Sequence, residues 1–116
     1  IIMAVERGVF MVTFLFIDQL PKTVDLNIRL AARGSRAEIF ILSVGREKAA
    51  TAINITLAHE APDTYGRVII KAALFDESRL MVRGMVDIKE GAKGADSYLL
   101  AKALLVSPKA RRSSDH

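Results

Sequence analysis

The residues of this chain best suited to chemistry are its two histidines, and only one of them lies where it could contribute to a site. His59 ends a strand and opens a turn, so its imidazole is expected to be exposed. A neutral imidazole can ligate iron or zinc, which makes His59 a candidate metal ligand. A histidine in such a position more often hydrogen-bonds the backbone of its own turn. His116 is the last residue of the sequence and carries no information about a site.

Three carboxylates resemble the paired acids of hydrolases. Asp87 and Glu90 precede a turn, and Asp96 follows it. Acid–base catalysis on a glycoside needs two carboxyl groups at a defined separation, and no feature of this spacing sets one. We therefore interpret these three residues as part of a solvated face.

Other polar residues are interpreted as turn formers. Asp63 and Thr64 follow a proline, and we expect the carboxylate or the hydroxyl to accept backbone N–H groups there. Asp76, Ser78 and Arg79 are interpreted in the same way, as corner residues.

The composition excludes several classes of protein. The chain has no cysteine, so it forms no disulfide, has no cysteine nucleophile and by itself holds no cysteine-ligated iron–sulfur cluster. A length of 116 residues indicates one domain, and 51% hydrophobic with 26% charged residues is typical of a globular chain.

The net charge of +4 is concentrated towards one end. Residues 1–99 hold 13 basic and 12 acidic side chains, whereas residues 100–116 hold four basic and one acidic. A nucleic-acid-binding surface needs basic side chains interleaved with aromatic ones, and residues 100–116 contain no aromatic residue. We expect no nucleic-acid partner.

Nothing in the sequence indicates a membrane segment or a secretory signal. The longest apolar run covers residues 9–17 and is interrupted by Thr13, whereas a transmembrane helix needs about 20 apolar residues. We expect a cytoplasmic protein with no membrane partner. The sequence starts at Ile1 and stops without a terminating element, which suggests a piece of a longer protein.

Alternation of apolar and polar residues with period 2 dominates the chain, as expected of β-strands. Each of these runs is followed within five residues by Gly, Pro or Asp, and only residues 97–106 have a helix-favouring content of Leu and Ala. The chain is therefore predicted to be all-β. The runs are residues 9–16, 24–30, 38–43, 52–57, 67–74 and 80–88.

The turns between these runs resemble one another. Each is polar and is followed by a small residue, at Ala37, Ser78, Ala92 and Ala110. Small side chains at repeated corners suit a stack of similar coils. Strands of mixed length suit a Greek-key sandwich equally well, so the pattern alone leaves both folds open.

Three stretches of sequence carry a family resemblance. Residues 59–67 read His-Glu-Ala-Pro-Asp-Thr-Tyr-Gly-Arg, residues 74–79 read Leu-Phe-Asp-Glu-Ser-Arg, and residues 90–98 read Glu-Gly-Ala-Lys-Gly-Ala-Asp-Ser-Tyr. Together they resemble the SufB/SufD family of iron–sulfur cluster assembly proteins, in particular its short, archaeal-type members. The similarity covers residues 59–112, and residues 1–58 carry only generic alternation.

The resemblance implies a right-handed parallel β-helix (a β-solenoid), and it implies that residues 97–106 form a strand. Residues 1–116 would be a single β-helix core domain. The resemblance also implies a scaffold, and no enzyme, in a SUF-type complex with the ABC-type ATPase SufC. A second SufB/SufD-type chain, or another copy in a homo-oligomer, would be a further partner. The fragment would hold no cofactor, and the intact complex would hold an iron–sulfur cluster transiently.

The chain also departs from the family. Ala101 stands where some members have a cysteine, and the His-containing signature expected after Ser114 is missing. No catalytic or cofactor-binding residue is therefore carried over, and His59 remains the metal candidate. Whether the chain is SufB-like or SufD-like stays open.

Two other functions remain alternatives. One is a structural β-solenoid that self-assembles end to end, and the other is a carbohydrate-active β-helix protein. The latter would normally show exposed aromatic residues and clustered carboxylates. A β-helix cut between coils exposes unpaired strand edges at both ends, so we expect this piece to self-associate, with residues 9–17 as the favoured contact.

Overall fold

The computed structural model describes residues 2–5, 9–16, 22–106, 109 and 111–115. Within these residues the chain is all-β, with nine strands and no helix. The strands are β1 (Ile2–Val5), β2 (Val9–Phe16), β3 (Thr23–Leu30), β4 (Arg36–Gly45), β5 (Ala50–His59), β6 (Tyr65–Leu74), β7 (Arg79–Ile88), β8 (Asp96–Leu105) and β9 (Arg111–Asp115).

The described strands form two parallel sheets. Sheet A has the order β1-β3-β5-β7-β9, and sheet B has the order β2-β4-β6-β8. Consecutive strands alternate between the sheets, so each coil gives one strand to each sheet. In the middle of the stack the register advances by 29 residues, since Arg36 pairs with Tyr65 and Ala50 with Arg79. All-parallel pairing of this kind defines a solenoid and is incompatible with an antiparallel Greek-key sandwich.

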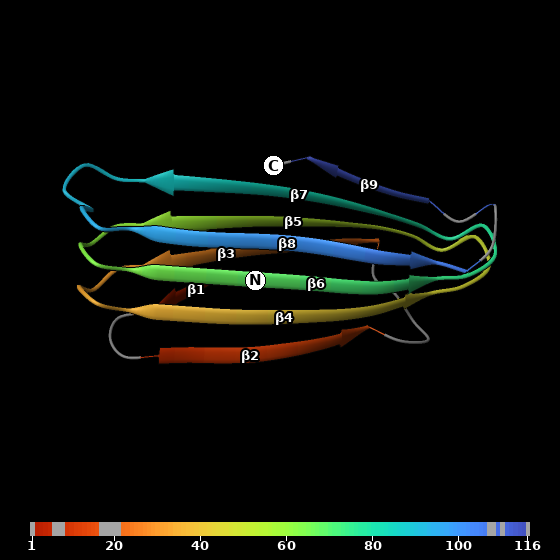
Figure 1. The fold of residues 1–116 in the computed structure, drawn as a ribbon, viewed down its shortest axis with the longest axis horizontal. Coiled ribbons are helices and arrows are strands. Elements are labelled where there is room, and N and C mark those ends of the chain that lie inside the picture. The colour runs from red at the N-terminus through yellow and green to blue at the C-terminus, as the bar shows by residue number, and fades with distance from the viewer. Residues whose placement is uncertain (1, 6–8, 17–21, 107–108, 110, 116) are drawn as a thin grey trace.

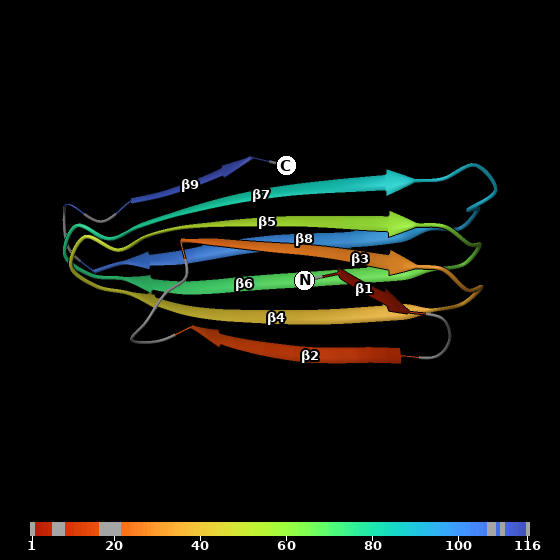
Figure 2. The same ribbon diagram turned by 180° about the vertical axis from the view of Figure 1, so that it is seen from behind.

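The coil is right-handed. In Figure 1 the strands of sheet B lie in front and point to the right, those of sheet A lie behind and point to the left, and the chain climbs from β2 to β9. Figure 2 shows the same path from behind. A chain that moves right in front and left behind while it rises traces a right-handed coil. The expected right-handed parallel β-helix is therefore confirmed, with about three turns.

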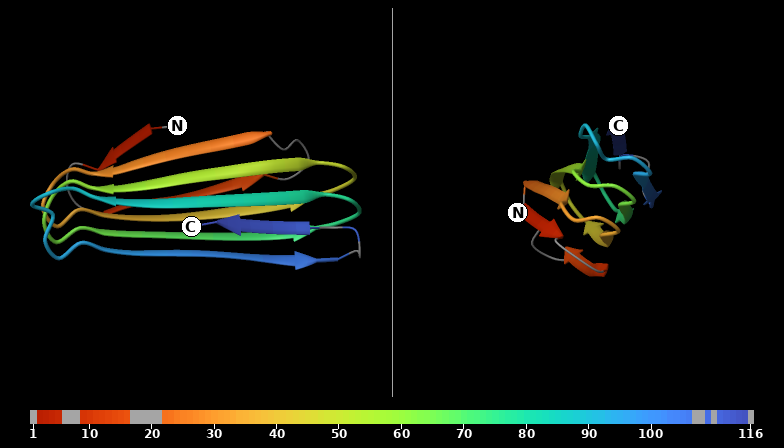
Figure 3. Two further views of the ribbon diagram at one scale, coloured as in Figure 1. Left: turned by 90° about the horizontal axis from the view of Figure 1, so that it is seen from above. Right: turned by 90° about the vertical axis from the view of Figure 1, so that its left-hand side faces the viewer.

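The solenoid is broad and short. Its extents are 46 × 21 × 18 Å, and the views in Figure 3 show that the longest dimension follows the strands, across the axis of the coil. Each coil is therefore a wide, flattened loop with two tight corners.

Alternating side chains explain why the two sheets close on one core. Leu26, Ile28, Ile53 and Ile55 point inward, as predicted, and each is at most 2% exposed. Parallel register places Leu26 beside Ile55, so aliphatic side chains form ladders from one coil to the next. Because a single coil has two open faces, its inner side chains are buried only by stacking on neighbours.

The predicted β-runs all form strands, and residues 97–105 lie in β8 despite their helix-favouring composition. Residues 111–115, for which no strand was predicted, form β9, which pairs with the first half of β7. Its sequence, Arg-Arg-Ser-Ser-Asp, has no apolar alternation, so pairing with β7 and not hydrophobic patterning defines the strand.

The corners contain small buried residues, as predicted. Ala37 and Ser78 are fully buried and Ala92 is 6% exposed, while Ala110 lies outside the described residues. The part of the chain that the structure describes has no helix long and apolar enough to cross a membrane.

Strand β2 is an edge strand of sheet B, which fits the expected contact through residues 9–17. Phe14, however, packs against the core, whereas Met11 and Leu15 are 64% and 61% exposed. An edge contact through β2 would therefore use the outward side chains. Ile17 lies outside the described residues.

Candidate functional site

Of the three stretches that carry the family resemblance, residues 74–79 form a corner at one end of the solenoid, between β6 and β7. Residues 59–67, between β5 and β6, and residues 90–98, between β7 and β8, form corners at the other end. Corresponding corners of successive coils stack there. Gly34, Asp63 and Gly94 each adopt positive φ, at 74°, 58° and 75°. Pro62 O accepts the Gly34 N–H at 3.0 Å, and Lys93 O accepts the Asp63 N–H at 2.8 Å. The left-handed backbone at this position is thus repeated and hydrogen-bonded from coil to coil.

Gly94 allows the closest approach in this stack. A Cβ atom at that position would lie 2.5 Å from Asp63 Oδ1, well inside van der Waals contact. Glycine also adopts positive φ without steric cost. Asp63 is further held by Arg33, whose Nε lies 3.4 Å from Asp63 Oδ2. Asp63 is therefore a turn residue, as predicted, but its carboxylate accepts from the Arg33 side chain and not from a backbone N–H.

His59 lies inside this corner, contrary to the expected exposed ring. Its side chain is 0% exposed, and Nδ1 lies 2.8 Å from Thr64 Oγ1. Thr64 Oγ1 in turn donates to Ala61 O at 3.2 Å. Because the single hydroxyl proton goes to Ala61 O, Thr64 Oγ1 accepts from His59, which places the imidazole proton on Nδ1.

Thr64 therefore binds differently from what we predicted. Its hydroxyl donates to a backbone carbonyl and accepts from a side chain, and it does not accept a backbone N–H. The predicted backbone hydrogen bond of His59 is likewise replaced by this side-chain contact.

Two buried polar atoms at this corner have no hydrogen-bond partner. They are His59 Nε2, which carries the lone pair of the imidazole, and the hydroxyl oxygen of Ser35. Ser35 occupies the corner one coil before Thr64, and Tyr65 N–H donates to Ser35 O at 3.0 Å. The corner thus places three polar side chains in an otherwise aliphatic interior.

Burial lowers the pKa of His59 below its ordinary value, and the nearby carboxylate of Asp96 offsets part of this decrease. The neutral ring is consequently the stable form at neutral pH. Its free Nε2 is chemically able to bind a metal, but it is sealed from solvent. In the described part of the chain no group of three or more His, Asp or Glu side chains gathers as a metal site would require.

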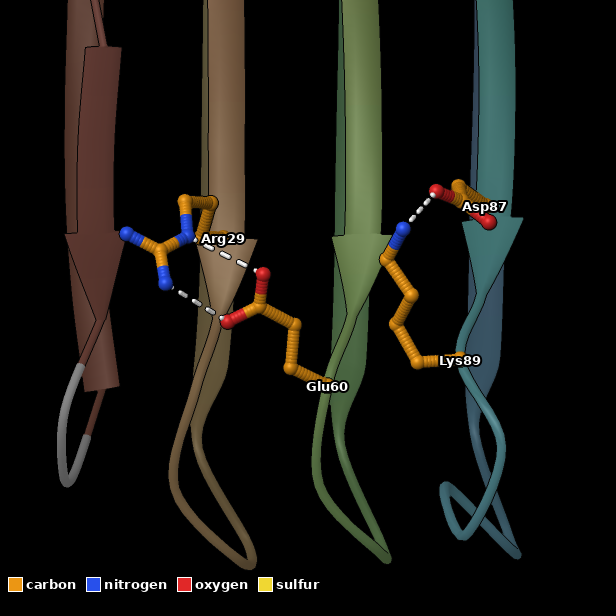
Figure 4. A network of polar contacts seen from close by, with 4 residues as sticks. All are labelled: Arg29, Glu60, Asp87 and Lys89. Atoms are coloured by element: carbon orange, nitrogen blue, oxygen red, sulfur yellow. Dashed lines mark hydrogen bonds and ion pairs between the residues drawn. The ribbon is translucent and has the colours of Figure 1, made fainter.

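Charged side chains lie on the outer surface of the same corner (Figure 4). Arg29 donates two hydrogen bonds to Glu60, both at 3.0 Å. Lys89 Nζ lies 2.7 Å from Asp87 Oδ2. The hydrogen bond from Arg29 is the main cause that lowers the pKa of Glu60, and the hydrogen bond to Asp87 raises the pKa of Lys89.

These charges border a shallow groove of about 240 Å³ on the outer face of sheet A. Its polar wall includes Asn27 and Thr56. Acidic and basic groups alternate along it, so the groove carries little net charge and has no preference for an ion of one sign.

The three carboxylates considered as catalytic acids do not form a pair. Asp87 is engaged by Lys89, Glu90 is exposed in the corner after β7, and Asp96 is exposed at the start of β8. Their interpretation as surface charges agrees with these positions.

The second set of corners also matches the prediction. Asp76 Oδ2 accepts the Glu47 N–H of the preceding coil at 2.9 Å, and Ser78 Oγ donates to Phe75 O at 2.6 Å. Arg79 begins β7, directly after the corner.

Ala101, the position of a cysteine in some family members, lines the interior. It borders a cavity of about 10 Å³ together with Ile55 and Gly84, among other apolar residues. A cavity this small and apolar does not hold an ordered water. The position therefore contributes packing in this chain, with Arg112 donating a hydrogen bond to the Ala101 carbonyl.

Sequence reasoning missed the ion pair between Arg29 and Glu60, which are 31 residues apart. The signal that could have found it is the 29-residue register, which places Leu30 beside His59 and so brings Arg29 close to Glu60. Similar corner sequences 29 residues apart, Ala-Arg-Gly-Ser at residues 32–35 and Ala-Pro-Asp-Thr at residues 61–64, indicate the same repeat.

Comparison with known proteins agrees with this fold. The family described as SUF system FeS cluster assembly, SufBD core domain, matches residues 11–115. This match includes the N-terminal half, where the sequence motifs were uninformative. No curated protein and no solved structure matches the chain significantly. Since the family covers nearly the whole chain, the protein belongs to the SufB/SufD family of SUF-system iron–sulfur cluster assembly proteins.

Proposed function

We propose that this chain is the β-helix core of a scaffold subunit in a SUF-type complex. In this complex it works with an ABC-type ATPase of the SufC kind and with a second SufB/SufD-type subunit, or with another copy of itself, in the cytoplasm. The observation that carries the proposal is the family match over residues 11–115, which coincides with the stacked coils.

The proposal assigns no catalytic step to the chain. The residues most able to act as acids or bases are engaged in structure: His59 binds Thr64, Glu60 binds Arg29, and Asp87 binds Lys89. Stacked corners and an aliphatic interior suit a rigid frame that holds other groups in place. An iron–sulfur cluster would be the cargo of the complex, and groups other than these residues would bind it transiently.

The test is to purify the affinity-tagged parent protein from its native cells. We expect an ABC-type ATPase to co-purify, and depletion of the protein to lower the activity of iron–sulfur enzymes. A matched pair of variants links this result to the solenoid. Ile55→Asp places a carboxylate in the core, whereas Thr56→Asp places one on the outward face of the same strand.

We expect Thr56→Asp to restore iron–sulfur enzyme activity in depleted cells and Ile55→Asp to fail. If no ATPase co-purifies and depletion leaves iron–sulfur enzymes active, the proposal is wrong. A self-assembling structural solenoid would instead give filaments of the purified parent protein in negative-stain images, without an ATPase.

A further inference from the structure

The outward faces of the two sheets differ in chemistry. Sheet A presents mainly polar side chains, including Asp25, Asn54 and Arg83. Sheet B presents apolar side chains at most outward positions of its four described strands. We define the apolar patch as the following outward residues of sheet B: Leu15, Phe40, Leu42, Val44, Ile69, Ala73, Leu100 and Leu104.

Several members of the apolar patch are open to solvent. Leu104 is 67% exposed, Leu15 61% and Leu42 41%. Apolar residues scattered singly over a surface need no explanation, but a continuous patch marks a binding surface. These side chains are continuous because parallel register aligns Phe40 with Ile69, and Ile69 with Leu100.

The apolar patch contains a groove of about 410 Å³. Ile69, only 8% exposed although it points outward, is part of its lining, together with Phe40 and Leu42. Arg67 and Lys71 line it as well. The patch therefore combines an apolar depression with cationic side chains, and Lys71 lies in its middle row, beside Leu42.

The positive charge in the middle row of the patch is uncompensated within the described residues. Lys71 pairs in register with Lys102, so two ammonium groups come from adjacent positions of β6 and β8. Apart from each other, their outward neighbours on the same and the adjacent strands are apolar, and neither lysine forms an ion pair with a described residue. By contrast, Arg36 at the other end of the sheet is paired with Glu38 at 3.3 Å. Adjacent like charges are destabilising until an anionic group approaches.

We propose that the apolar patch binds an amphipathic α-helix whose apolar stripe is flanked by acidic residues. The patch spans four strands, about 14 Å at the usual strand spacing, and its three outward rows span about 13 Å along the strands. A helix is about 10–12 Å in diameter and advances about 5.4 Å per turn. One helix of two to three turns therefore covers the patch, with acidic side chains beside its apolar stripe placed over Lys71 and Lys102 in the middle row on β6 and β8.

Other occupants fit less well. A second copy docked through the same face brings Lys71 and Lys102 towards the same lysines of its partner, which like-charge repulsion opposes. An anionic membrane would satisfy the lysines, but a flat bilayer leaves a groove of this kind empty. A ridge of helix side chains fills it.

The absence of cysteine in the chain makes a site-specific test direct. Leu104→Cys places an environment-sensitive dye at the rim of the apolar patch, and Met85→Cys places it on the outer face of sheet A at similar exposure, 61%. The probe is a helical peptide of about 18 residues with Leu at positions i, i+3, i+4 and i+7 and flanking Glu. A second peptide replaces each Glu by Lys.

We expect the Glu peptide to shift the emission of the Leu104→Cys protein to the blue and to leave the Met85→Cys protein unchanged. It should bind about tenfold more tightly than the Lys peptide at low salt. The double variant Lys71→Glu with Lys102→Glu should reverse this preference. The control double variant Lys22→Glu with Lys93→Glu makes the same change in net charge elsewhere and should keep the original preference.

Equal binding of both peptides, or of neither, would overturn the proposal, as would the same reversal in the control double variant. Binding to phosphatidylglycerol vesicles without binding to the Glu peptide would assign the face to a membrane. A blue shift that grows with protein concentration in the absence of peptide would assign it to a second copy.

Discussion

The contact between His59 and Thr64 gives the sharpest test of the corner. Thr64→Val keeps the shape of the side chain and removes the hydroxyl. The change deletes the acceptor of the His59 Nδ1–H and the donor to Ala61 O. Because Nε2 already lacks a partner, the buried imidazole would have no hydrogen bond left.

The expected loss follows from these atoms. A buried polar group that loses its partner costs about 1–3 kcal/mol, and two groups are affected. We expect the free energy of unfolding to fall by about 2–4 kcal/mol, a large part of the 5–15 kcal/mol typical of a domain. Thr64→Ser keeps the hydroxyl and should lose much less.

A double-mutant cycle isolates the contact. His59→Leu replaces the imidazole by the residue type found at Leu30, its register neighbour in β3. In that background Thr64→Val should cost about 1–2 kcal/mol less, since no imidazole is left unpaired.

The assay is urea unfolding followed by far-ultraviolet circular dichroism, because the chain has no tryptophan. The m-value should stay constant, since the same surface is exposed on unfolding. If Thr64→Val lowers stability equally in both backgrounds, or leaves the midpoint unchanged, the hydrogen bond does not stabilise the corner as we reason.

Four further predictions follow from the fold. Because burial lowers the pKa of His59 from 6.5, the unfolded chain binds more protons below that pH. Stability should therefore fall as the pH drops below about 6.5, and His59→Leu should flatten this part of a stability–pH curve. Ile55→Asp should abolish folding, as measured by circular dichroism, because an unpaired carboxylate in the core costs several kcal/mol. Thr56→Asp should fold. A cooperatively melting Ile55→Asp protein would contradict the core assignment. Anaerobic reconstitution of the chain with iron and sulfide should give no visible cluster absorbance, because thiolates are absent, and a stoichiometric signal lost in His59→Ala would refute this. Met11→Lys puts a charge on edge strand β2 and should shift light scattering towards monomer, and a wild-type chain that is monomeric at high micromolar concentration would refute the edge contact.

The strands and the core could be predicted from the sequence because they depend on local alternation. Leu26 and Ile28 alternate with Asp25 and Asn27, and a period of 2 assigns each to one face of a strand. Parallel rather than antiparallel pairing could not be predicted in this way, since both use the same alternation. The family resemblance favoured parallel pairing, and the structure shows parallel strands with a register of 29 residues in the middle of the stack.

The candidate site was predicted less well, for a physical reason. Whether the ring of His59 is exposed depends on whether strand β5 stays regular up to its last residue. It does, so His59 continues the inward positions of Ile53 and Ile55, and its ring is buried. Contacts between coils, such as that of Arg29 with Glu60, join residues distant in sequence. Reasoning that considers one turn at a time does not detect them.

The register of the coils also has a mechanical consequence. All interstrand hydrogen bonds of the solenoid run along its axis, so tension along that axis opens the sheets one coil at a time, whereas tension along the strands shears many bonds at once. Each coil of 29 residues that peels away releases about 100 Å of extended chain. Under axial tension the solenoid therefore unfolds one coil at a time. It resists tension most strongly along the strands, the direction of its 46 Å dimension.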